Sequence, residues 1–123
     1  MKFLDSSIWI AHLVEANTKA ISLLESDTIL FSSILTLFEV RKKLIKEGFE
    51  IEEIMKILDF IKNRSVIVNL NDEIVNLAAE LSLKHDIPSI DSIIYSSSID
   101  VGINLLTFDN DFRGLENVEV LSK

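Results

Sequence analysis

The chain of 123 residues has no cysteine, one proline and three glycines. Without cysteine it can form neither a disulfide nor a thiolate metal site, so a bound metal must use oxygen ligands or the imidazoles of His12 and His85. So little proline and glycine excludes a flexible linker or a low-complexity segment. These absences predict a protein that folds in a reducing compartment, and the cytoplasm is the expected location.

Long hydrophobic runs are also missing, although hydrophobic residues make up 48% of the sequence and charged residues 26%. No run reaches the roughly 18 apolar residues of a membrane-spanning helix, and the amino terminus does not resemble an export signal. We expect no membrane contact and one domain covering residues 1–123. The high hydrophobic content predicts a surface covered by a partner, for example in a homodimer.

Positive charge is scarce, because 12 Lys and Arg residues face 20 Asp and Glu residues, giving a net charge of −8. Such a chain repels nucleic acid at long range, so RNA binding would need a local basic patch, a bound cation or both. The clearest patch consists of Arg41, Lys42, Lys43 and Lys46. These side chains could contact phosphates, or they could form an ordinary solvated helix face.

Short apolar segments alternate with segments of helical periodicity. We expect strands at 2–5, 28–31, 66–70, 103–107 and 118–121. We expect helices at 7–15, after Asn17 or Thr18, from Ser32 or Ser33 to Gly48, at 50–63, after Asn71 or Asp72, and from a cap at Ser89 to about Val101. This order predicts an α/β fold, a three-layer sandwich in which helices flank a central parallel sheet of four to five strands.

Four acidic residues stand at element junctions or among apolar residues, and each has a structural explanation. Asp5 could cap a helix, and Asp109 could belong to a turn or cap a short helix starting near Phe112. Glu39 could pair with Lys43, four residues further along a helix. Asp91 is expected in the first turn of a helix, where a carboxylate interacts favourably with the helix dipole. Taken singly, none of them indicates a function.

The positions of Asp5 and Asp109 carry more information together. Both follow apolar strands, at the carboxyl edge where parallel sheets collect functional residues. A cluster of carboxylates is unfavourable, because like charges raise one another's pKa, and a divalent cation removes this penalty. Mg²⁺ or Mn²⁺ accepts carboxylate ligands, can generate hydroxide and can neutralise charge on a phosphate. This chemistry requires neither cysteine nor histidine.

Four motifs resemble the PIN domain in order and spacing. They are "FLDSSIWI" with Asp5, "LFEV" with Glu39, "IPSIDSIIYSSS" with Asp91 and "LLTFDNDF" with Asp109. The similarity extends from Met1 to about Phe112, and the first and last motifs are the most specific. The short form of the chain resembles the VapC-type toxins of toxin–antitoxin pairs.

The resemblance implies a catalytic site, because the acids of that family bind Mg²⁺ or Mn²⁺ and hydrolyse RNA. Asp5, Glu39 and Asp91 would be the core triad. Asp109 would be the fourth acid, and all four would be both catalytic residues and metal ligands. The expected function is therefore that of a metal-dependent endoribonuclease, the toxin of a VapBC-type pair.

The resemblance also implies supporting residues and partners. The hydroxyls of Ser7 and Thr107 would support the acids or a water, and Asp111 would be an auxiliary acid. Of the basic patch, we expect Arg41, Lys42 and Lys43 to contact RNA. The expected partners are RNA, a cognate antitoxin that covers the site, and a second copy of the chain.

Two other functions stay open at this point. In a non-catalytic interaction module the acids would only cap helices, and the high hydrophobic content would reflect a covered surface. A receiver-like signalling domain would also have an acidic Mg²⁺ pocket. Such domains usually carry a pair of acids after the first strand and a lysine after a late strand, whereas Asp5 has no adjacent acid and "LLTFDN" contains no lysine.

Overall fold

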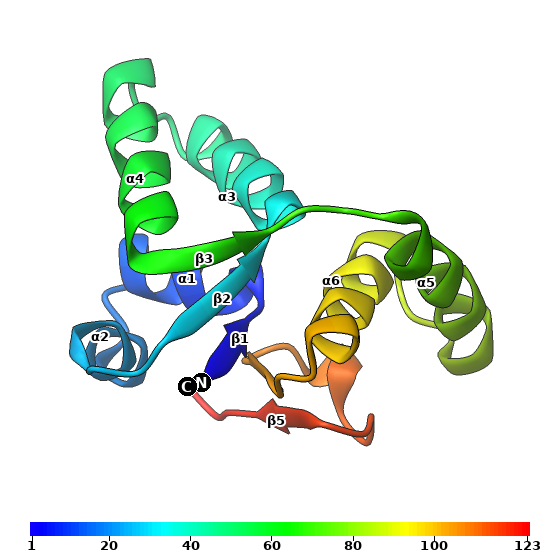
Figure 1. The fold of residues 1–123 in the computed structure, drawn as a ribbon. Helices are drawn as coiled ribbons and strands as arrows, with labels where there is room; N and C mark the ends of the chain where they lie inside the picture. Colours follow the sequence, from blue (N-terminus) through cyan, green and yellow to red (C-terminus); the bar gives the residue numbers. More distant parts are fainter.

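Five parallel strands form the centre of the computed structural model, which describes residues 1–123 (Figure 1). In sequence order they are β1 (Lys2–Leu4), β2 (Leu30–Ser33), β3 (Ser65–Val68), β4 (Leu105–Thr107) and β5 (Val118–Val120). Their order across the sheet is β3-β2-β1-β4-β5, and every neighbouring pair is parallel. The predicted parallel sheet is confirmed, with five strands.

Six α-helices and one short 3₁₀-helix connect these strands. They are α1 (Ser6–Leu13), α2 (Thr18–Glu25), α3 (Ile34–Lys46), α4 (Ile51–Arg64), α5 (Asp72–His85), α6 (Ser89–Val101) and η1 (Asn110–Phe112). Helices α3 and α4 pack against each other as a hairpin, and α5 packs against α6 on the other side of the sheet (Figure 1). No helix is both long and apolar enough to cross a bilayer.

The sheet has a separate hydrophobic core on each face. Leu4 and Leu106 point into the core that contains Trp9 and residues of α1 to α4. Phe3 and Leu105, their neighbours along the strands, point into the other core with residues of α6 and η1. Because successive residues of a strand point to opposite faces, one apolar run can serve both cores. The result is the predicted three-layer sandwich.

At the carboxyl edge of the sheet, strands are followed by helices. Asp5 follows β1, Ser33 ends β2 and Asp109 lies just beyond β4. Each side chain accepts a hydrogen bond from the backbone N–H two residues further on, at 3.4, 3.1 and 2.9 Å respectively. Polar caps are needed there because the first N–H groups of a helix have no partner within the helix.

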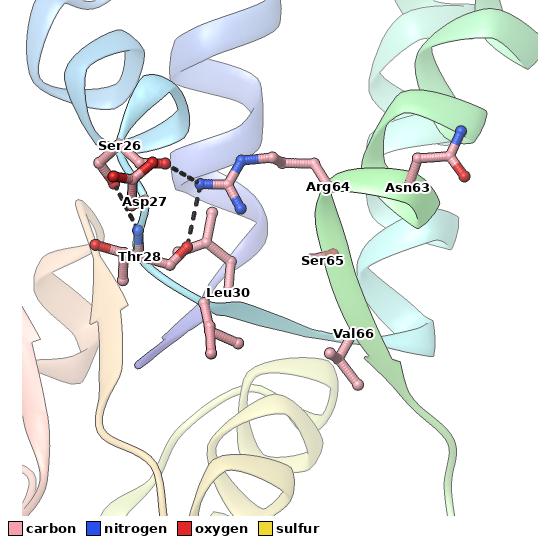
Figure 2. A pocket seen from close by; sticks show the side chains of 9 residues that line it. Ser26, Asp27, Thr28, Leu30, Asn63, Arg64, Ser65 and Val66 are labelled. Carbon is pink, nitrogen blue, oxygen red and sulfur yellow. Dashed lines mark hydrogen bonds between the residues drawn. The ribbon is translucent and has the colours of Figure 1, made fainter.

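Arg64 lies at the opposite, amino edge of the sheet. There it lines a cavity of about 360 Å³ between the starts of β2 and β3 (Figure 2). Its guanidinium donates hydrogen bonds to the backbone carbonyls of Leu24, Ser26 and Thr28, at 2.8, 3.0 and 3.2 Å. These bonds fasten the end of α4 to the turn that leads into β2.

Two details of the predicted elements are wrong. The second strand covers Leu30–Ser33 rather than 28–31, because the hydroxyl of Ser32 is fully buried and accepts a hydrogen bond from Trp9 Nε1 at 3.0 Å. Ser89 is the first residue of α6, and its cap is Pro88, which has no side-chain hydrogen bond to offer. The remaining boundaries agree with the prediction to within two residues.

Candidate metal centre

Asp5 is a buried carboxylate at the junction of β1 and α1, with 3% of its surface exposed. Its Oδ2 atom accepts hydrogen bonds from the hydroxyl of Thr107 at 2.8 Å and from the backbone N–H of Ser7 at 3.4 Å. The structural prediction of a helix cap is therefore confirmed. The carboxylate also lies among other acids, so a capping role does not exclude a chemical one.

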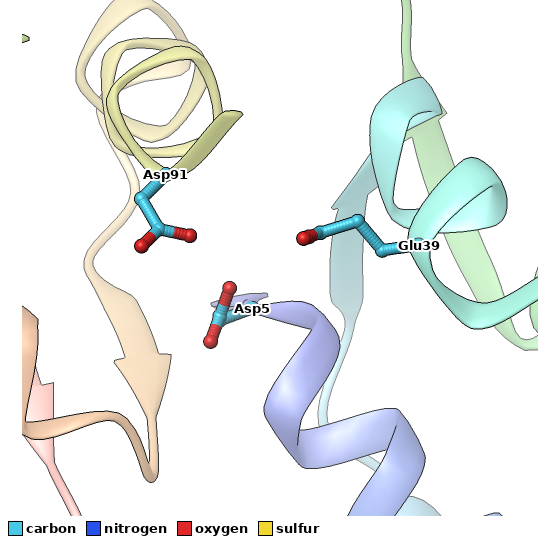
Figure 3. A group of neighbouring side chains, drawn as sticks. All are labelled: Asp5, Glu39 and Asp91. Carbon is cyan, nitrogen blue, oxygen red and sulfur yellow. The ribbon is translucent and has the colours of Figure 1, made fainter. Parts of the chain in front are cut away.

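Three carboxylates converge from three separate elements (Figure 3). Asp5 comes from the end of β1, Glu39 from α3 and Asp91 from the first turn of α6. One oxygen of each lies within 4.8 Å of the others. Negative charges at this separation repel one another, and an oxygen-liganded divalent cation would neutralise them.

A second group of acids shares Asp91 with the first. Asp91, Asp109 and Asp111 also have oxygens within 4.8 Å of one another. Asp109 caps η1 by accepting the backbone N–H of Asp111 at 2.9 Å, which fixes the two relative to each other. The structure thus brings the four predicted acids and the predicted auxiliary to one edge of the sheet.

The hydroxyl of Thr107 links the two groups. It donates to Asp5 Oδ2 at 2.8 Å and accepts the backbone N–H of Asp109 at 2.9 Å. It also lies 3.1 Å from Ser7 Oγ, and because its only proton is directed at Asp5, Ser7 must be the donor in that bond. Ser7 Oγ in turn accepts the N–H of Phe108 at 3.0 Å. Both hydroxyls lie where the sequence predicted support for the acids.

Glu39 is held by a residue that the sequence prediction left out. Its Oε1 atom accepts a hydrogen bond from Ser6 Oγ at 2.7 Å. The alternative pairing with Lys43 is wrong, because Lys43 forms its ion pair with Glu47 at 3.0 Å. The signal for Ser6 was its place next to Asp5, which puts the serine hydroxyl at the same edge of the sheet.

The carboxyl groups of the first cluster resist ionisation. Burial raises the pKa of Asp5, an effect that its hydrogen bond from a hydroxyl opposes in part. Burial also raises the pKa of Glu39, and the nearby charge of Asp5 adds to this increase. The pKa of Asp91 rises to about 7, through burial first and then repulsion by Asp5, Glu39 and the acids of the second group. Near neutral pH the cluster therefore keeps a proton that a cation could displace.

Without divalent metal, the melting temperature is expected to fall as the pH rises from about 5 to about 8. A carboxyl whose pKa is higher in the folded than in the unfolded state binds its proton more tightly when folded. The resulting stability is complete at low pH and is lost as the pH passes the folded pKa, about 7 for Asp91. Calorimetry in EDTA across this range measures the fall.

Two variants make that measurement specific to the cluster. Asp91→Asn removes the titrating group and should flatten most of the pH dependence. Asp100→Asn, an exposed residue of the same helix, should keep it. A wild-type melting temperature that rises over this range, or an unchanged slope in Asp91→Asn, would contradict the prediction.

Residues 2–118 of the chain match the family model of the PIN domain. The chain belongs to the PIN domain family. The resemblance stated from the four motifs is therefore confirmed, and the receiver-like alternative is wrong. No curated protein matches the chain by sequence.

Several solved structures similar to this PIN domain are toxins or toxin–antitoxin complexes. A toxin–antitoxin complex from Klebsiella pneumoniae gives a TM-score of 0.81 at 21% identity, covering 100% of both chains. VapC20 from Mycobacterium tuberculosis, a Sarcin-Ricin loop cleaving toxin, gives 0.82 at 21% identity, covering 98% of both. VapBC2 from Rickettsia felis, bound to a promoter DNA fragment, gives 0.80 at 19%, covering 98% of this chain and 97% of that one. At these identities the likeness establishes the VapC-like fold.

The predicted basic residues of this PIN domain lie on α3, directly after Glu39. Arg41 and Lys42 are exposed and form no ion pair, whereas Lys43 is engaged by Glu47. Neither group of acids contains a histidine. Of the three residues predicted to contact RNA, Arg41 and Lys42 are therefore best able to bind an incoming anion.

Proposed function

We propose that this PIN domain is a metal-dependent endoribonuclease that hydrolyses phosphodiester bonds of RNA. We further propose that it acts as the toxin of a VapBC-type toxin–antitoxin pair, within a single domain covering residues 1–123. The observation that carries the proposal is the convergence of Asp5, Glu39 and Asp91 from three elements, with oxygens within 4.8 Å and no cationic side chain hydrogen-bonded to them. Acids that served only as helix caps would have no reason to meet.

The donor set fits Mg²⁺ or Mn²⁺, because it consists of carboxylate oxygens that repel one another. Asp5, Glu39, Asp91 and Asp109 would hold the ion, and Asp111 would complete the second group. When bound, the ion lowers the pKa of a water and neutralises charge on the phosphate. Membership of the PIN domain family supports this assignment, because nucleases of that family use a divalent metal.

The chain's own residues would orient the site and move the proton. Thr107 and Ser7 hold the carboxylate of Asp5 in one orientation through the hydrogen bonds described above. Ser6 does the same for Glu39. A carboxylate of the cluster would accept the proton of the attacking water. Arg41 and Lys42 would bind phosphates of the RNA beside the site.

The proposed partners are a cognate antitoxin and a second copy of the chain. Several solved neighbours are toxin–antitoxin complexes, which supports an antitoxin for this chain as well. A basic antitoxin side chain would be attracted to the acidic site and could exclude the cation. Large apolar side chains remain exposed on the isolated chain, among them Ile29, Met55 and Val75, and a protein partner would bury some of them.

The proposed activity predicts that purified protein cleaves a labelled RNA in Mn²⁺ or Mg²⁺ and that EDTA abolishes the cleavage. An Asp5→Asn, Asp91→Asn double variant, purified identically, measures contaminating nuclease. Calorimetric titration with Mn²⁺ should show binding to the wild type and none to the double variant. Cleavage that survives EDTA would contradict the mechanism. If folded, antitoxin-free protein showed neither cleavage nor Mn²⁺ binding, that result would favour the non-catalytic interaction module.

A further inference from the structure

One face of α3 combines an exposed aromatic ring with free cations. Phe38 precedes Glu39 in the chain, and 52% of its surface is exposed. Arg41, Lys42 and Ile45 follow at the spacing that places residues on one side of a helix. Side chains on a helix lean toward its amino end, and α3 begins at the carboxyl edge of the sheet. Phe38 therefore leans toward the acid cluster.

Two cavities lie along this face, and one of them reaches the acids. The first, of about 250 Å³, is lined by Glu39, Ser6 and Ile90 together with Phe38 and Lys42. Because Glu39 is in the first acid group and Ile90 precedes Asp91, this cavity adjoins the candidate metal centre. Lys43 and Lys46 also line it.

The second cavity lies further along the helix. It measures about 380 Å³ and is lined only by Phe38, Arg41, Lys42 and Ile45. Phe38 and Lys42 line both cavities, so the two hollows are neighbours that share these side chains. Their position, beside the acids and along the helix toward Arg41, suits a chain that runs past the site.

The charge of this face favours a polyanion over other occupants. The whole protein has a net charge of −8, and three ion pairs account for all of its paired side-chain charges. Arg41, Lys42 and Lys46 take part in none of them. A ring flanked by unpaired cations is the arrangement with which proteins bind single-stranded nucleic acid, the ring stacking on a base and the cations on the backbone.

We propose that Phe38 stacks on an unpaired base next to the scissile phosphate of single-stranded RNA, while Arg41 and Lys42 bind the neighbouring phosphates. The inference rests on the proposed ribonuclease activity and assigns its substrate a single-stranded segment at the cut. A base within a duplex cannot stack on a protein ring, so duplex RNA should be a poor substrate. Stacking does not read base identity, so the ring contributes affinity rather than sequence preference.

A fluorescence titration tests this contact without requiring cleavage. Trp9, the single native tryptophan, is fully buried, so an indole placed at position 38 is the only exposed one. In EDTA, a single-stranded oligoribonucleotide should quench the added emission of Phe38→Trp, and a duplex of the same sequence should quench it far less. Leu83→Trp is the matched control, because Leu83 is 86% exposed on α5, outside the proposed surface. Its emission should not respond.

Steady-state cleavage kinetics then test the role of Phe38 in the reaction. Phe38→Ala should raise the KM for single-stranded RNA about tenfold with kcat little changed, and Phe38→Trp should retain the wild-type KM. Leu83→Ala should match the wild type.

Three results would separate the inference from the proposed activity. Wild-type cleavage with no quenching of Phe38→Trp and no change of KM in Phe38→Ala would overturn the stacking proposal alone. A change of oligomeric state in Phe38→Ala, measured as molecular mass in solution, without a change in RNA affinity would also overturn the stacking proposal. This face of α3 would then be a protein interface. Quenching by single-stranded RNA without wild-type cleavage would support the contact and contradict the nuclease.

Discussion

Replacing Asp5 with asparagine is expected to reduce RNA cleavage about a thousandfold while the protein stays folded. Asp5 is the most buried acid of the cluster, and its carboxylate lies within 4.8 Å of both Glu39 and Asp91. The change removes a proposed metal ligand and one negative charge from the site. Metal stabilisation of the reacting phosphate is worth several kcal/mol, and each 1.36 kcal/mol corresponds to about tenfold in rate.

The asparagine variant should fold because it preserves the local structure. Its side-chain oxygen can still cap α1 and accept the hydrogen bond from Thr107. Loss of one charge also relieves repulsion within the acid cluster. In metal-free buffer at pH about 8, its melting temperature is therefore expected to equal or exceed that of the wild type.

Single-turnover cleavage in Mn²⁺ and thermal melting in EDTA measure the two effects separately. Asp59→Asn is the control, since Asp59 is an exposed acid of α4 and has the same charge change. It should cleave RNA like the wild type. A folded Asp5→Asn protein that kept about a tenth of the wild-type rate would remove Asp5 from the proposed metal ligands.

Much of the site could be predicted because the sheet edge is encoded locally. An apolar run that ends in an acid identified both Asp5 and Asp109, and parallel strands bring such endings together. The position of Asp91 in the first turn of a helix whose start Pro88 defines was also predicted, although its role as a ligand came only from the resemblance. In these cases a short stretch of sequence fixes the backbone position of the carboxylate.

Glu39 shows what local sequence patterns cannot predict. Helical periodicity placed it equally well on a solvated face beside Lys43, and only its contact with Ser6 decides between the two. The contact joins residues 33 positions apart and depends on how α3 lies against α1. Such packing follows from the whole fold, so the sequence alone left both interpretations open.

The polar end of β2 was misread for a related reason. The second strand was predicted to end at Phe31, and Ser32 or Ser33 was predicted to cap the next helix, since serine is a common cap. Ser33 does cap α3, whereas Ser32 is a buried strand residue whose hydroxyl satisfies the indole of Trp9. A hydroxyl inside a strand is stable only when a distant residue supplies its partner, and local sequence does not show that partner.

Thr107→Val is expected to weaken Mn²⁺ binding by about 10- to 100-fold, because Thr107 supports a proposed ligand without binding the ion itself. Its hydroxyl is fully buried and donates to Asp5 Oδ2 at 2.8 Å. Valine keeps the branched shape but leaves Asp5 without this hydrogen bond and the N–H of Asp109 without an acceptor. Both acids would then lose part of their fixed orientation.

A pH series distinguishes this positioning role from a general loss of stability. The hydrogen bond from Thr107 lowers the pKa of Asp5, which burial otherwise raises, so its removal should move Mn²⁺ binding to higher pH. Thr107→Ser keeps the hydroxyl and should restore both affinity and pH profile. Ser32→Ala removes another buried hydroxyl, on β2, and should lower the melting temperature without moving the profile.

The comparison of these three variants decides what the hydroxyl network is for. If Thr107 only filled space in the sheet, valine would fill it nearly as well, and Mn²⁺ affinity would be unchanged in a folded protein. If stability alone governed binding, Ser32→Ala would lose affinity to the same extent. A shift confined to Thr107→Val would mean that the proton directed at Asp5 favours the ionised form of this buried carboxylate and orients it for a cation, a requirement that a helix cap alone does not have.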